Sequence, residues 1–519
     1  MKICRIAIER FRGIKKSTLI LPDHVVLIGD NNTGKSTIFE AMDLALGPDR
    51  INRRSVIDEH DFYRGEYLPI EGEPERQIRI EVTIIGLTDE QKNRFVEFIE
   101  FWDCSKSELL SEGPVEAVDG QSIQSALRVA FIGFYDSDDD DFSGKTYFAR
   151  SLEDGGNPQE FRKKDKQFCG FLYLRSLRTG SRALSLEHGS LLDIILRLKE
   201  IRPQMWEKTI AEVGAFDVAS DPELGIAGVL QSIESAIQKF VPKEWGVAPH
   251  LKVSNLTREH LRKVVTAFIA TGDGDHAAPF YRQGTGTINL LVLAMLSQIA
   301  ADKQNVIFAM EEPETAIPPY AQKRIVHEIR RLSVQSLFTS HSPYVLEEFS
   351  LDETVVLHRD NHGELSQSMI KLPASVKHKR YRHEFRTRFC EGLLARRILM
   401  AEGETEATAM PVAARRLSEL APGDYVSFEA LGLCVVDAGS DSQIADLSEL
   451  YVGLGKEVFG LCDKQSDAQK TKIEASVTQL FMHSEKGFED LVIKNTTQEA
   501  IERFVDLLDW PPHLATKYP

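Results

Sequence analysis

Residues 25–36 read VVLIGDNNTGKS. The four apolar residues at the start predict a buried strand, and the eight that follow match the phosphate-binding pattern G-x-x-x-x-G-K-[ST]. Glycine lets the backbone curl so that its N–H groups point at phosphate oxygens, and a helix expected over residues 36–46 adds the positive end of its dipole. We expect ATP contacts from Gly29, Asn31, Asn32, Gly34, Lys35, Ser36 and Thr37. In this pattern Lys35 faces the β and γ phosphates and Ser36 binds Mg²⁺, so the stretch predicts an α/β nucleotide-binding domain.

A second apolar segment ends in acids nearly three hundred residues downstream. Residues 306–314 read VIFAMEEPE, so that Glu311 and Glu312 follow a predicted strand. In phosphoryl transfer one carboxylate holds the metal or its water shell, and its neighbour orients or deprotonates the attacking water. We assign Glu311 to the metal and Glu312 to the water; a solvated acidic loop is the alternative.

A third strand is predicted over residues 336–340, and His341 follows it. A histidine at a strand end can sense the γ-phosphate and help hold the attacking water, although a lone histidine is more often structural. The three segments together predict a nucleotide hydrolase whose active site is assembled from distant parts of the chain.

The order of these motifs resembles a known group of enzymes. The phosphate loop, Glu-Glu-Pro-Glu at 311–314 and Thr-Ser-His-Ser-Pro at 339–343 are similar to the ABC-type ATPases related to chromosome-maintenance and DNA-repair enzymes. Residues 3–12 (ICRIAIERFR) resemble the first strand of the overcoming-lysogenisation-defect (OLD) family, and the chain also resembles Gabija-type and retron-associated defence effectors. The OLD resemblance implies an ABC-type P-loop ATPase joined to a Toprim (Rossmann-like) α/β domain.

The segment before the acidic strand resembles the signature loop of the OLD family. Residues 282–287 read RQGTGT and precede an apolar helix expected over residues 288–301. The resemblance implies that Gly284 and Gly286 cap an ATP held by another subunit, which requires a homodimer or a higher oligomer. A helix-capping loop is the alternative. Asp61 and Phe62 resemble the Q-loop segment of the family, and an ordinary Asx turn explains them equally well.

The C-terminal third carries a second group of acids. Residues 397–406 read RILMAEGETE, a strand followed by Glu-Gly and a further glutamate, which resembles the first Toprim motif. Residues 458–467 read VFGLCDKQSD, where Toprim domains have Asp-x-Asp after the strand; this chain has Gln465 at the second acidic position. An amide oxygen is a weaker ligand than a carboxylate, so we expect one weakened metal site unless Asp467 compensates.

The resemblance implies a metal-dependent nuclease site at these strand ends. Two divalent cations, Mg²⁺ or alternatively Mn²⁺, would be held by carboxylates and would activate water. The expected catalytic residues are Glu402, Glu406, Asp463 and Glu489, and the expected metal ligands of the whole chain are Ser36, Glu311, Glu402, Glu406, Asp463 and Asp467. A flavodoxin-like domain with polar loops is the alternative. The implied function is ATP-regulated endonuclease cleavage of nucleic acid, with DNA as the expected target, in antiphage defence; the competing hypothesis keeps the ATPase and makes the Toprim domain a silent scaffold.

The chain divides into five predicted segments. We expect ATPase parts at 1–186 and 246–370, a helical insertion at 187–245, a basic linker at 371–396 and a Toprim-like domain at 397–519 that looks short for the family. The resemblance suggests dimerisation by the insertion, although its helices could equally be ordinary core helices. The basic linker interleaves basic residues with Tyr381, His383, Phe385 and Phe389, which predicts either a nucleic-acid groove with base stacking or an amphipathic helix with a solvated basic face.

Composition restricts the partners. The chain has 519 residues and a net charge of −17, which argues against nucleic-acid binding by the whole surface but not against a local basic groove. Its six cysteines are scattered without zinc-ligand spacing, and no segment reaches the about 20 apolar residues of a membrane helix. We expect a cytoplasmic protein without a membrane, whose partners are nucleic acid, its own copies, and a partner protein or ribonucleoprotein of a defence system.

Overall fold

The computed structural model describes residues 1–48, 56–70, 76–110, 122–153, 157–174, 186, 190–199, 202–215, 226–237, 239, 257–270, 277–302, 306–315, 317–509 and 512–517. The chain forms two compact units, which are described one at a time. Unit 1 comprises residues 1–46, 53–162 and 335–519, and unit 2 comprises residues 47–52 and 163–334.

The larger sheet of unit 1 places the phosphate-binding segment at its parallel side. The strands are β1 (Lys2–Phe11), β2 (Ile14–Ile20), β3 (His24–Ile28), β4 (Ile78–Ile85), β5 (Ile99–Asp103), β6 (Glu108–Leu110), β7 (Ile123–Asp136), β8 (Asp141–Phe148), β13 (Gln335–Thr339), β14 (Thr354–Arg359) and β15 (Glu364–Met369). Their order is β6-β5-β7-β4-β1-β2-β15-β14-β3-β13, with β8 paired to β7. Both neighbours of β3 run parallel to it. Residues 25–28 of β3 are fully buried, as expected for a strand covered on both faces.

A helix follows β3 where the sequence predicts one. Helix α1 (Lys35–Leu46) buries Ile38, Met42 and Ala45, whose spacing places them on one face. The remaining short helices of this part are η2 (Glu59–Asp61), η3 (Tyr63–Gly65), α2 (Asp89–Arg94), η4 (Val96–Phe98), α3 (Ala149–Glu153), α12 (Pro343–Leu346) and η10 (Leu351–Glu353). The strand, the loop and α1 thus form the βα turn that phosphate binding requires.

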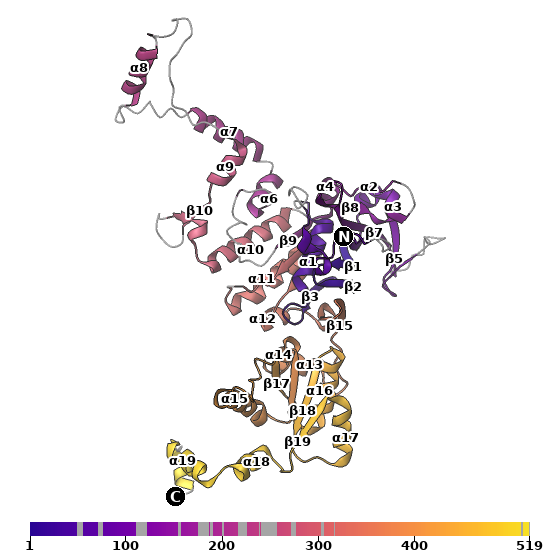
Figure 1. The fold of residues 1–519 in the computed structure, drawn as a ribbon, viewed down its shortest axis with the longest axis vertical. Coiled ribbons are helices and arrows are strands. Elements are labelled where there is room, and N and C mark those ends of the chain that lie inside the picture. The colour runs from indigo at the N-terminus through magenta and orange to yellow at the C-terminus, as the bar shows by residue number, and fades with distance from the viewer. Residues whose placement is uncertain are drawn as a thin grey trace. The chain divides into compact units, whose positions relative to one another are not determined.

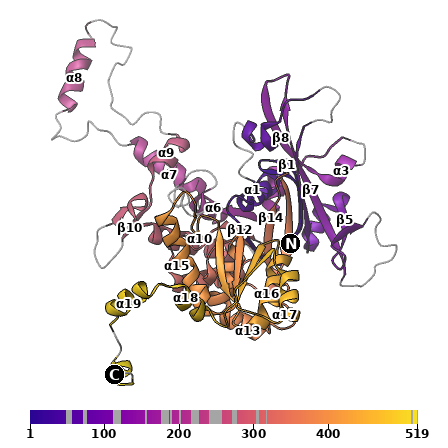
Figure 2. The same ribbon diagram turned by 60° about the horizontal axis from the view of Figure 1, so that its bottom comes forward.

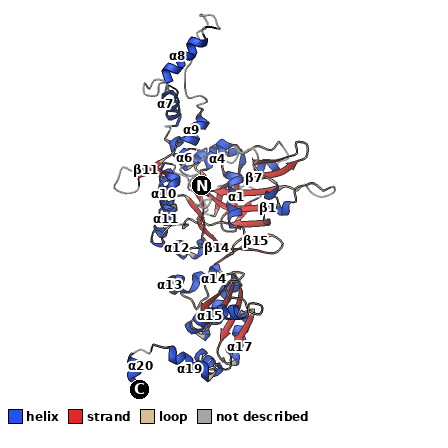
Figure 3. Cartoon of the chain, turned by 60° about the vertical axis from the view of Figure 1, so that its left-hand side comes forward, coloured by secondary structure: helices blue, strands red, loops and turns tan. Residues whose placement is uncertain are grey.

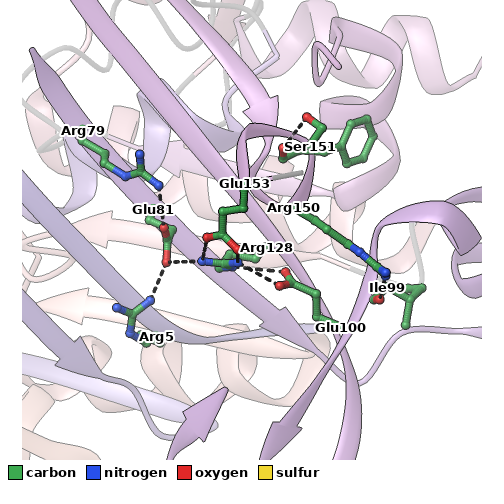
Figure 4. A network of polar contacts seen from close by, with 10 residues as sticks. Arg5, Arg79, Glu81, Ile99, Glu100, Arg128, Arg150, Ser151 and Glu153 are labelled. Carbon is green, nitrogen blue, oxygen red and sulfur yellow. Dashed lines mark hydrogen bonds and ion pairs between the residues drawn. The ribbon is translucent and has the colours of Figure 1, made fainter. Parts of the chain in front are cut away.

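The antiparallel side of this sheet is held together by buried charges. Arg128 on β7 forms ion pairs with Glu100 on β5 at 2.8 Å, with Glu153 on α3 at 2.8 Å and with Glu81 on β4 at 3.5 Å (Figure 4). Arg5 also contacts Glu81, at 2.7 Å. Burial opposes ionisation of Glu81, but the surrounding arginines hold its pKa below the usual value. The network joins the four strands β1, β4, β5 and β7 to α3. Strand β7 continues into the long hairpin with β8 (Figure 2).

Unit 2 is mainly helical (Figure 3). Its elements are α4 (Lys163–Cys169), β9 (Phe171–Leu174), α6 (Leu191–Leu198), α7 (Arg202–Ala215), α8 (Ile226–Ile237), α9 (Arg258–Val264), β10 (Phe268–Ala270), β11 (Ala277–Pro279), η9 (Phe280–Arg282), α10 (Thr285–Asp302), β12 (Ile307–Glu311) and α11 (Pro319–Leu332). Strands β9 and β12 pair in parallel. Helices α6, α7 and α8 lie in the segment for which helices are expected, and their use in dimerisation stays a prediction.

The C-terminal part of unit 1 forms a second, four-stranded parallel sheet. Its strands are β16 (Arg397–Ala401), β17 (Leu433–Asp437), β18 (Glu457–Cys462) and β19 (Gln479–Met482), in the order β17-β16-β18-β19 (Figure 1). Its helices are α15 (Glu404–Leu420), α16 (Asp441–Gly453), α17 (Asp467–Ser476), α18 (Phe488–Asn495), α19 (Gln498–Leu507) and α20 (Pro512–Lys517). The chain moves from β16 to one side and then returns to the other, so the topological switch point lies between β16 and β18. In open parallel sheets, ligands bind at the carboxyl ends of the strands at this point.

The basic linker is helical, and its aromatic residues are core residues. It forms α13 (His378–Glu384), a π-helical turn η11 (Phe385–Phe389) and α14 (Cys390–Leu394). Tyr381, Phe385 and Phe389 are buried, and the Tyr381 ring contacts both phenylalanine rings. Base stacking by these three residues is therefore wrong, because their rings are already used in packing. The amphipathic helix is the alternative that the structure favours.

The described residues contain neither a membrane-spanning helix nor a disulfide. No helix among the described residues is long and apolar enough to cross a membrane. The six cysteines are all free, and all except Cys104 are buried.

Candidate active sites at two sheet edges

The phosphate loop is shaped by glycine and by close packing against β14. Gly34 has a φ of +116° and Asn32 a φ of +68°, a region that glycine adopts freely and asparagine tolerates. A Cβ atom on Gly29 would lie 2.8 Å from the carbonyl oxygen of Leu357 on β14. A larger residue at position 29 would therefore push the loop away from the sheet.

Lys35 is folded back into its own loop. Its Nζ donates hydrogen bonds to the carbonyl oxygens of Gly29 at 2.7 Å and Asp30 at 2.9 Å. The Thr33 hydroxyl donates to the Asp30 carbonyl at 2.6 Å and closes the turn. Among the other predicted ATP contacts, Asn31, Asn32 and Ser36 are exposed and Thr37 is half-buried. In this structure the Lys35 ammonium group is therefore held by the loop backbone, next to the start of α1.

His341 lies at the same edge of the sheet as the loop. It follows β13, which runs parallel to β3 with Thr339 opposite Leu27. The carboxyl ends of parallel neighbours meet at one edge, so His341 and the residues after Ile28 leave the sheet side by side. His341 is half-buried. Its assignment as a γ-phosphate sensor stays a prediction, as does a Q-loop role for Asp61, whose carboxylate accepts a hydrogen bond from Arg12 at 2.8 Å.

In unit 2, a tyrosine positions the first of the two adjacent glutamates. Glu311 ends β12, and its carboxylate accepts a hydrogen bond from the Tyr173 hydroxyl. Tyr173 on β9 lies opposite Ala309, two residues before Glu311, and strand residues two apart share a face. The hydroxyl therefore reaches the carboxylate across the parallel pair. The structure places the Glu311 side chain by a partner that the sequence motif does not contain.

Glu312 has an unusual backbone conformation. Its φ is +44°, a left-handed value that costs a non-glycine residue about 1 kcal/mol or more. Thr315 supports the turn, since its N–H donates to the Glu312 carbonyl at 3.0 Å and its hydroxyl to the carboxylate at 3.4 Å. Strained residues are frequent at active sites, which is compatible with the predicted role in holding water.

The predicted signature loop precedes a helix. Gly284 is exposed directly before α10, and the N–H of Ile288 donates to its carbonyl oxygen at 3.1 Å. Gly286 lies in the first turn of α10, which begins three residues earlier than the predicted helix. Capping of ATP on another subunit by these glycines stays a prediction.

In the second sheet, Glu402 and Asp463 meet at the switch point. Glu402 follows β16 and Asp463 follows β18, and the Asp463 N–H donates to Glu402 Oε2 at 3.1 Å. The Gln465 amide nitrogen donates to Glu402 Oε2 at 3.2 Å and to Asp463 Oδ1 at 2.6 Å. Two carboxylates from strands about 60 residues apart in sequence thus converge on one amide nitrogen.

The environment of Glu402 favours its neutral form. Burial raises the pKa of Glu402 to about 7; the N–H of Asp463 opposes this rise, and the Asp463 carboxylate adds to it. A carboxyl group with a pKa near neutrality is typical of functional sites. A cation between Glu402 and Asp463 would reverse the effect, because an opposite charge favours ionisation.

The other two predicted carboxylates lie beside the first turn of α15. Glu406 is 7% exposed, and its Oε2 lies 3.2 Å from the position that a Cβ on Gly403 would take. Glu489, at the start of α18, accepts a hydrogen bond from the Thr405 hydroxyl at 3.2 Å. The fold thus gathers both near the residue that follows β16, although they do not join Glu402 and Asp463 in a preformed metal cage.

Asp467 stands apart from the carboxylate pair. It is exposed at the first position of α17, and no contact between it and Glu402 or Asp463 is recorded among the described residues. Within the same described part of the chain, no group of three or more His, Cys, Asp or Glu side chains is arranged to hold a metal ion. Glu402 and Asp463 are the two predicted ligands that the structure brings into contact, and metal binding by the whole predicted set stays a prediction.

The C-terminal module also contacts the phosphate loop, within unit 1. Lys456 precedes β18, its side chain is 4% exposed, and its Nζ lies 3.9 Å from Asp30 Oδ1. The preceding residue, Gly455, packs against the His358 ring on β14, next to Leu357, which touches Gly29. Burial lowers the pKa of Lys456, and Asp30 opposes that change. Burial also lowers the pKa of His358, and the charge of Lys456 lowers it further.

Three residues of the structure, Tyr173, His483 and Lys456, do not belong to any of the sequence motifs. Tyr173 lies in a short strand, FLYL at 171–174, that the sequence analysis does not predict. His483 follows β19 at the carboxyl edge, and both its ring nitrogens are buried without a hydrogen-bond partner among the described residues. The rule that singled out His341, a histidine at a strand end, would have found His483. No sequence signal marks Lys456, because its partner lies more than 400 residues away.

Two family models match the chain. The model described as AAA ATPase domain matches residues 1–117 and 187–346, which is more than half of the chain. The model described as overcoming lysogenization defect protein-like, TOPRIM domain, matches residues 393–464. The second match contains β16 to β18 and therefore both Glu402 and Asp463.

One curated relative and several solved structures are similar. The Old nuclease of Escherichia phage P2 is 20% identical over 544 residues, covering 97% of this chain and 85% of that protein. The SmcHead bound to the C-winged helix domain of ScpA is 11% identical, with a TM-score of 0.39 over 72% of this chain and 99% of that chain. The SMC head domain from Thermotoga maritima is 12% identical, with a TM-score of 0.31 over 72% of this chain and 100% of that chain.

Proposed function

We propose that this chain, which belongs to the AAA ATPase domain family and joins that ATPase to an OLD-like TOPRIM domain, is an ATP-hydrolysing endonuclease that requires a divalent metal. The resemblance to the OLD family is confirmed, and so are an α/β ATPase and a Toprim domain in this order. These domains are those of an ATP-dependent nuclease. Endonuclease cleavage, the choice of Mg²⁺ and antiphage defence are the finer parts of the proposal.

One observation carries the nuclease proposal. Glu402 and Asp463 come together at the carboxyl edge, at the switch point of the parallel sheet, within reach of a single amide nitrogen. Two carboxylates this close repel one another unless positive charge lies between them. A pair held in this way supports divalent-metal binding at the position where α/β sheets bind their ligands.

The residues of the pair would act as metal ligands. A divalent cation held there supplies Lewis-acid polarisation of a phosphate and lowers the pKa of a bound water. Glu402 and Asp463 would hold and orient that group as its carboxylate ligands. Glu406 and Glu489, beside the first turn of α15, are proposed to complete the ligand set through water.

The ATPase assignments follow the same reasoning. Lys35 would exchange its two carbonyl partners for phosphate oxygens, and Ser36 would bind the metal that accompanies ATP. Glu311 would hold the water shell of that metal and Glu312 the attacking water. His341 would sense the γ-phosphate, and Gly284 and Gly286 of another subunit would close the site.

A plasmid-cleavage assay with Mg²⁺ or Mn²⁺ tests the nuclease. We expect Glu402→Ala to abolish cleavage, whereas Glu404→Ala, which removes an exposed glutamate two residues away, should leave it unchanged. Absence of cleavage by the unmodified protein under both metals, or equal cleavage by Glu402→Ala, would contradict the proposal. ATP hydrolysis measured on the same preparations reports whether the first site is intact.

A second function has a specific observation in its favour. Gln465 replaces the second acid of the Toprim pattern, and the described residues hold no ready three-ligand metal cluster. A silent Toprim domain that serves as a scaffold for nucleic acid or a protein would explain both. The scaffold hypothesis predicts nucleic-acid or protein binding that does not change with Glu402→Ala.

The proposed partners follow from the activity. Nucleic acid, with DNA as the expected target, is the substrate, and a homodimer or higher oligomer is required for signature glycines to act on another subunit. Exposed basic residues of the linker, including Lys377, Lys379 and Arg382, are available for phosphate contacts. A partner protein or ribonucleoprotein of a defence system, and a cytoplasmic location, remain predictions.

A further inference from the structure

Gln465 occupies the space between two carboxylates. Its amide nitrogen lies 2.6 Å from Asp463 Oδ1 and 3.2 Å from Glu402 Oε2, so one NH₂ group serves both acids. A carboxylate only accepts hydrogen bonds, and an amide offers two N–H groups on one atom. The chemistry therefore fixes the orientation of the amide, because its oxygen in this position would face two negative groups.

The amide does part of what a cation would do. It stabilises the approach of Glu402 and Asp463 with two charge-assisted hydrogen bonds, which are stronger than bonds between neutral groups. The Asp463 N–H donates the third hydrogen bond to the pair, to Glu402 Oε2 at 3.1 Å. The carboxylate pair is thus already satisfied before any metal arrives.

We propose that Gln465 is an internal competitor of the metal, so that a cation binds between Glu402 and Asp463 only after the amide nitrogen releases both carboxylates. This inference rests on the proposed metal-dependent function of the site and makes Gln465 the residue that sets its metal affinity. An aspartate at this position would add a ligand and remove the competitor. The amide thus lets the site assemble without metal and weakens the binding of metal.

Metal binding by the full-length protein without nucleotide tests the inference directly. Titration calorimetry with Mn²⁺ should show tighter binding by Gln465→Asp than by the unmodified protein, by about tenfold or more, because affinity rises with ligand charge. Ser466→Asp is the matched control. It adds the same charge one residue away, and aspartate caps α17 as well as the Ser466 hydroxyl does. Binding in a Glu402→Ala background identifies heat that comes from other sites.

A second variant separates a competitor from a ligand. Gln465→Ala removes the amide without adding charge, and we expect it to bind Mn²⁺ at least as tightly as the unmodified protein. Loss of Mn²⁺ binding in Gln465→Ala would show that the amide is a ligand and would overturn the inference. Equal affinities for Gln465→Asp and Ser466→Asp would overturn it as well.

Thermal unfolding gives a readout that does not depend on cleavage. In EDTA, Gln465→Asp should melt at a lower temperature than Ser466→Asp, because three carboxylates would then lie together without the amide. Mn²⁺ should remove this difference, because a cation between the carboxylates relieves their repulsion. An equal melting temperature in EDTA would count against the inference. If the unmodified protein cuts no nucleic acid but these shifts occur, the proposed nuclease fails while the role of Gln465 stands.

Discussion

The phosphate loop and the carboxyl edge of the Toprim sheet are built from different groups. The loop offers backbone N–H groups, a helix start and one lysine, all positioned by glycine and by packing against β14. The Toprim edge offers carboxylates, whose positions depend on single side chains such as Gln465. A site made of backbone tolerates changes among its neighbours, whereas a site made of side chains changes its chemistry with one substitution.

This difference explains why one site matches its family pattern and the other departs from it. In the loop, the pattern G-x-x-x-x-G-K-[ST] is complete, and the structure requires glycine at position 29 for space and at position 34 for its positive φ. At the Toprim edge, an amide stands between β18 and α17 where the family pattern has an acid, and it donates to two carboxylates. Substitutions at the two sites should therefore differ in size and in kind.

The largest expected effect is the loss of a cation ligand. Asp463→Asn removes one of the two converging charges and with it the proposed metal. Because a metal contributes several kcal/mol to phosphate cleavage, we expect the rate to fall by about a thousandfold. Cleavage of plasmid under single-turnover conditions measures it. Asp467→Asn should have little effect, since Asp467 is exposed and apart; an equal loss in both variants would mean that the pair alone is not the site.

The next effect concerns the loop. Lys35→Ala should reduce ATP hydrolysis about a hundredfold or more, because a preorganised positive group facing the transferred phosphate is lost. Lys16→Ala, on the exposed face of β2, is the control. Release of inorganic phosphate is the measurement. An unchanged rate of ATP hydrolysis in Lys35→Ala would contradict the assignment of the phosphate loop as the ATPase site.

A smaller effect is expected from a supporting side chain. Tyr173→Phe removes the hydroxyl that donates to Glu311, and a hydrogen bond to a charged group is worth about 1.5–3 kcal/mol. We expect about a tenfold decrease in ATP hydrolysis with unchanged nucleotide affinity, because Glu311 is misplaced and the loop is intact. A change in affinity alone would show that Tyr173 acts on binding instead.

The smallest expected effect is on the pH dependence of folding stability, through His358 on β14. Because burial lowers the pKa of His358 in the folded protein, the unfolded chain binds a proton at higher pH than the folded one. Stability is therefore complete above about pH 6.5 and falls as the pH drops through the lower, folded-state pKa. His358→Gln should flatten this dependence in denaturant titrations at pH 7.5 and 5, whereas His362→Gln, in an exposed turn, should not.

The elements that carry chemistry were predictable because strand and helix patterns surround each motif. The strand predicted over 397–401 has the same bounds as β16, and the helix predicted over 36–46 differs from α1 only because α1 begins one residue earlier. Alternating or periodic apolar residues report burial directly, and burial decides these elements.

Contacts between side chains were not predictable from the same patterns. Tyr381, Phe385 and Phe389 alternate with basic residues as a base-stacking surface would, and only the fold reveals that they pack on one another. The departure at Gln465 was visible in sequence, but its two acceptors depend on the strand order β17-β16-β18-β19. Tyr173 reaches Glu311 across a parallel pair whose members are more than 130 residues apart.

The position of Lys456 ties the two chemistries to one strand. Strand β18 starts directly after Lys456, which lies beside Asp30 of the phosphate loop, and ends directly before Asp463, about 20 Å away. A hydrogen-bonded strand is stiff along its length, so it connects Lys456 beside the phosphate loop to Asp463 at the opposite end of the strand. Binding free energies are linked reciprocally: if nucleotide in the loop favours one position of this strand, that position favours nucleotide binding by the same factor.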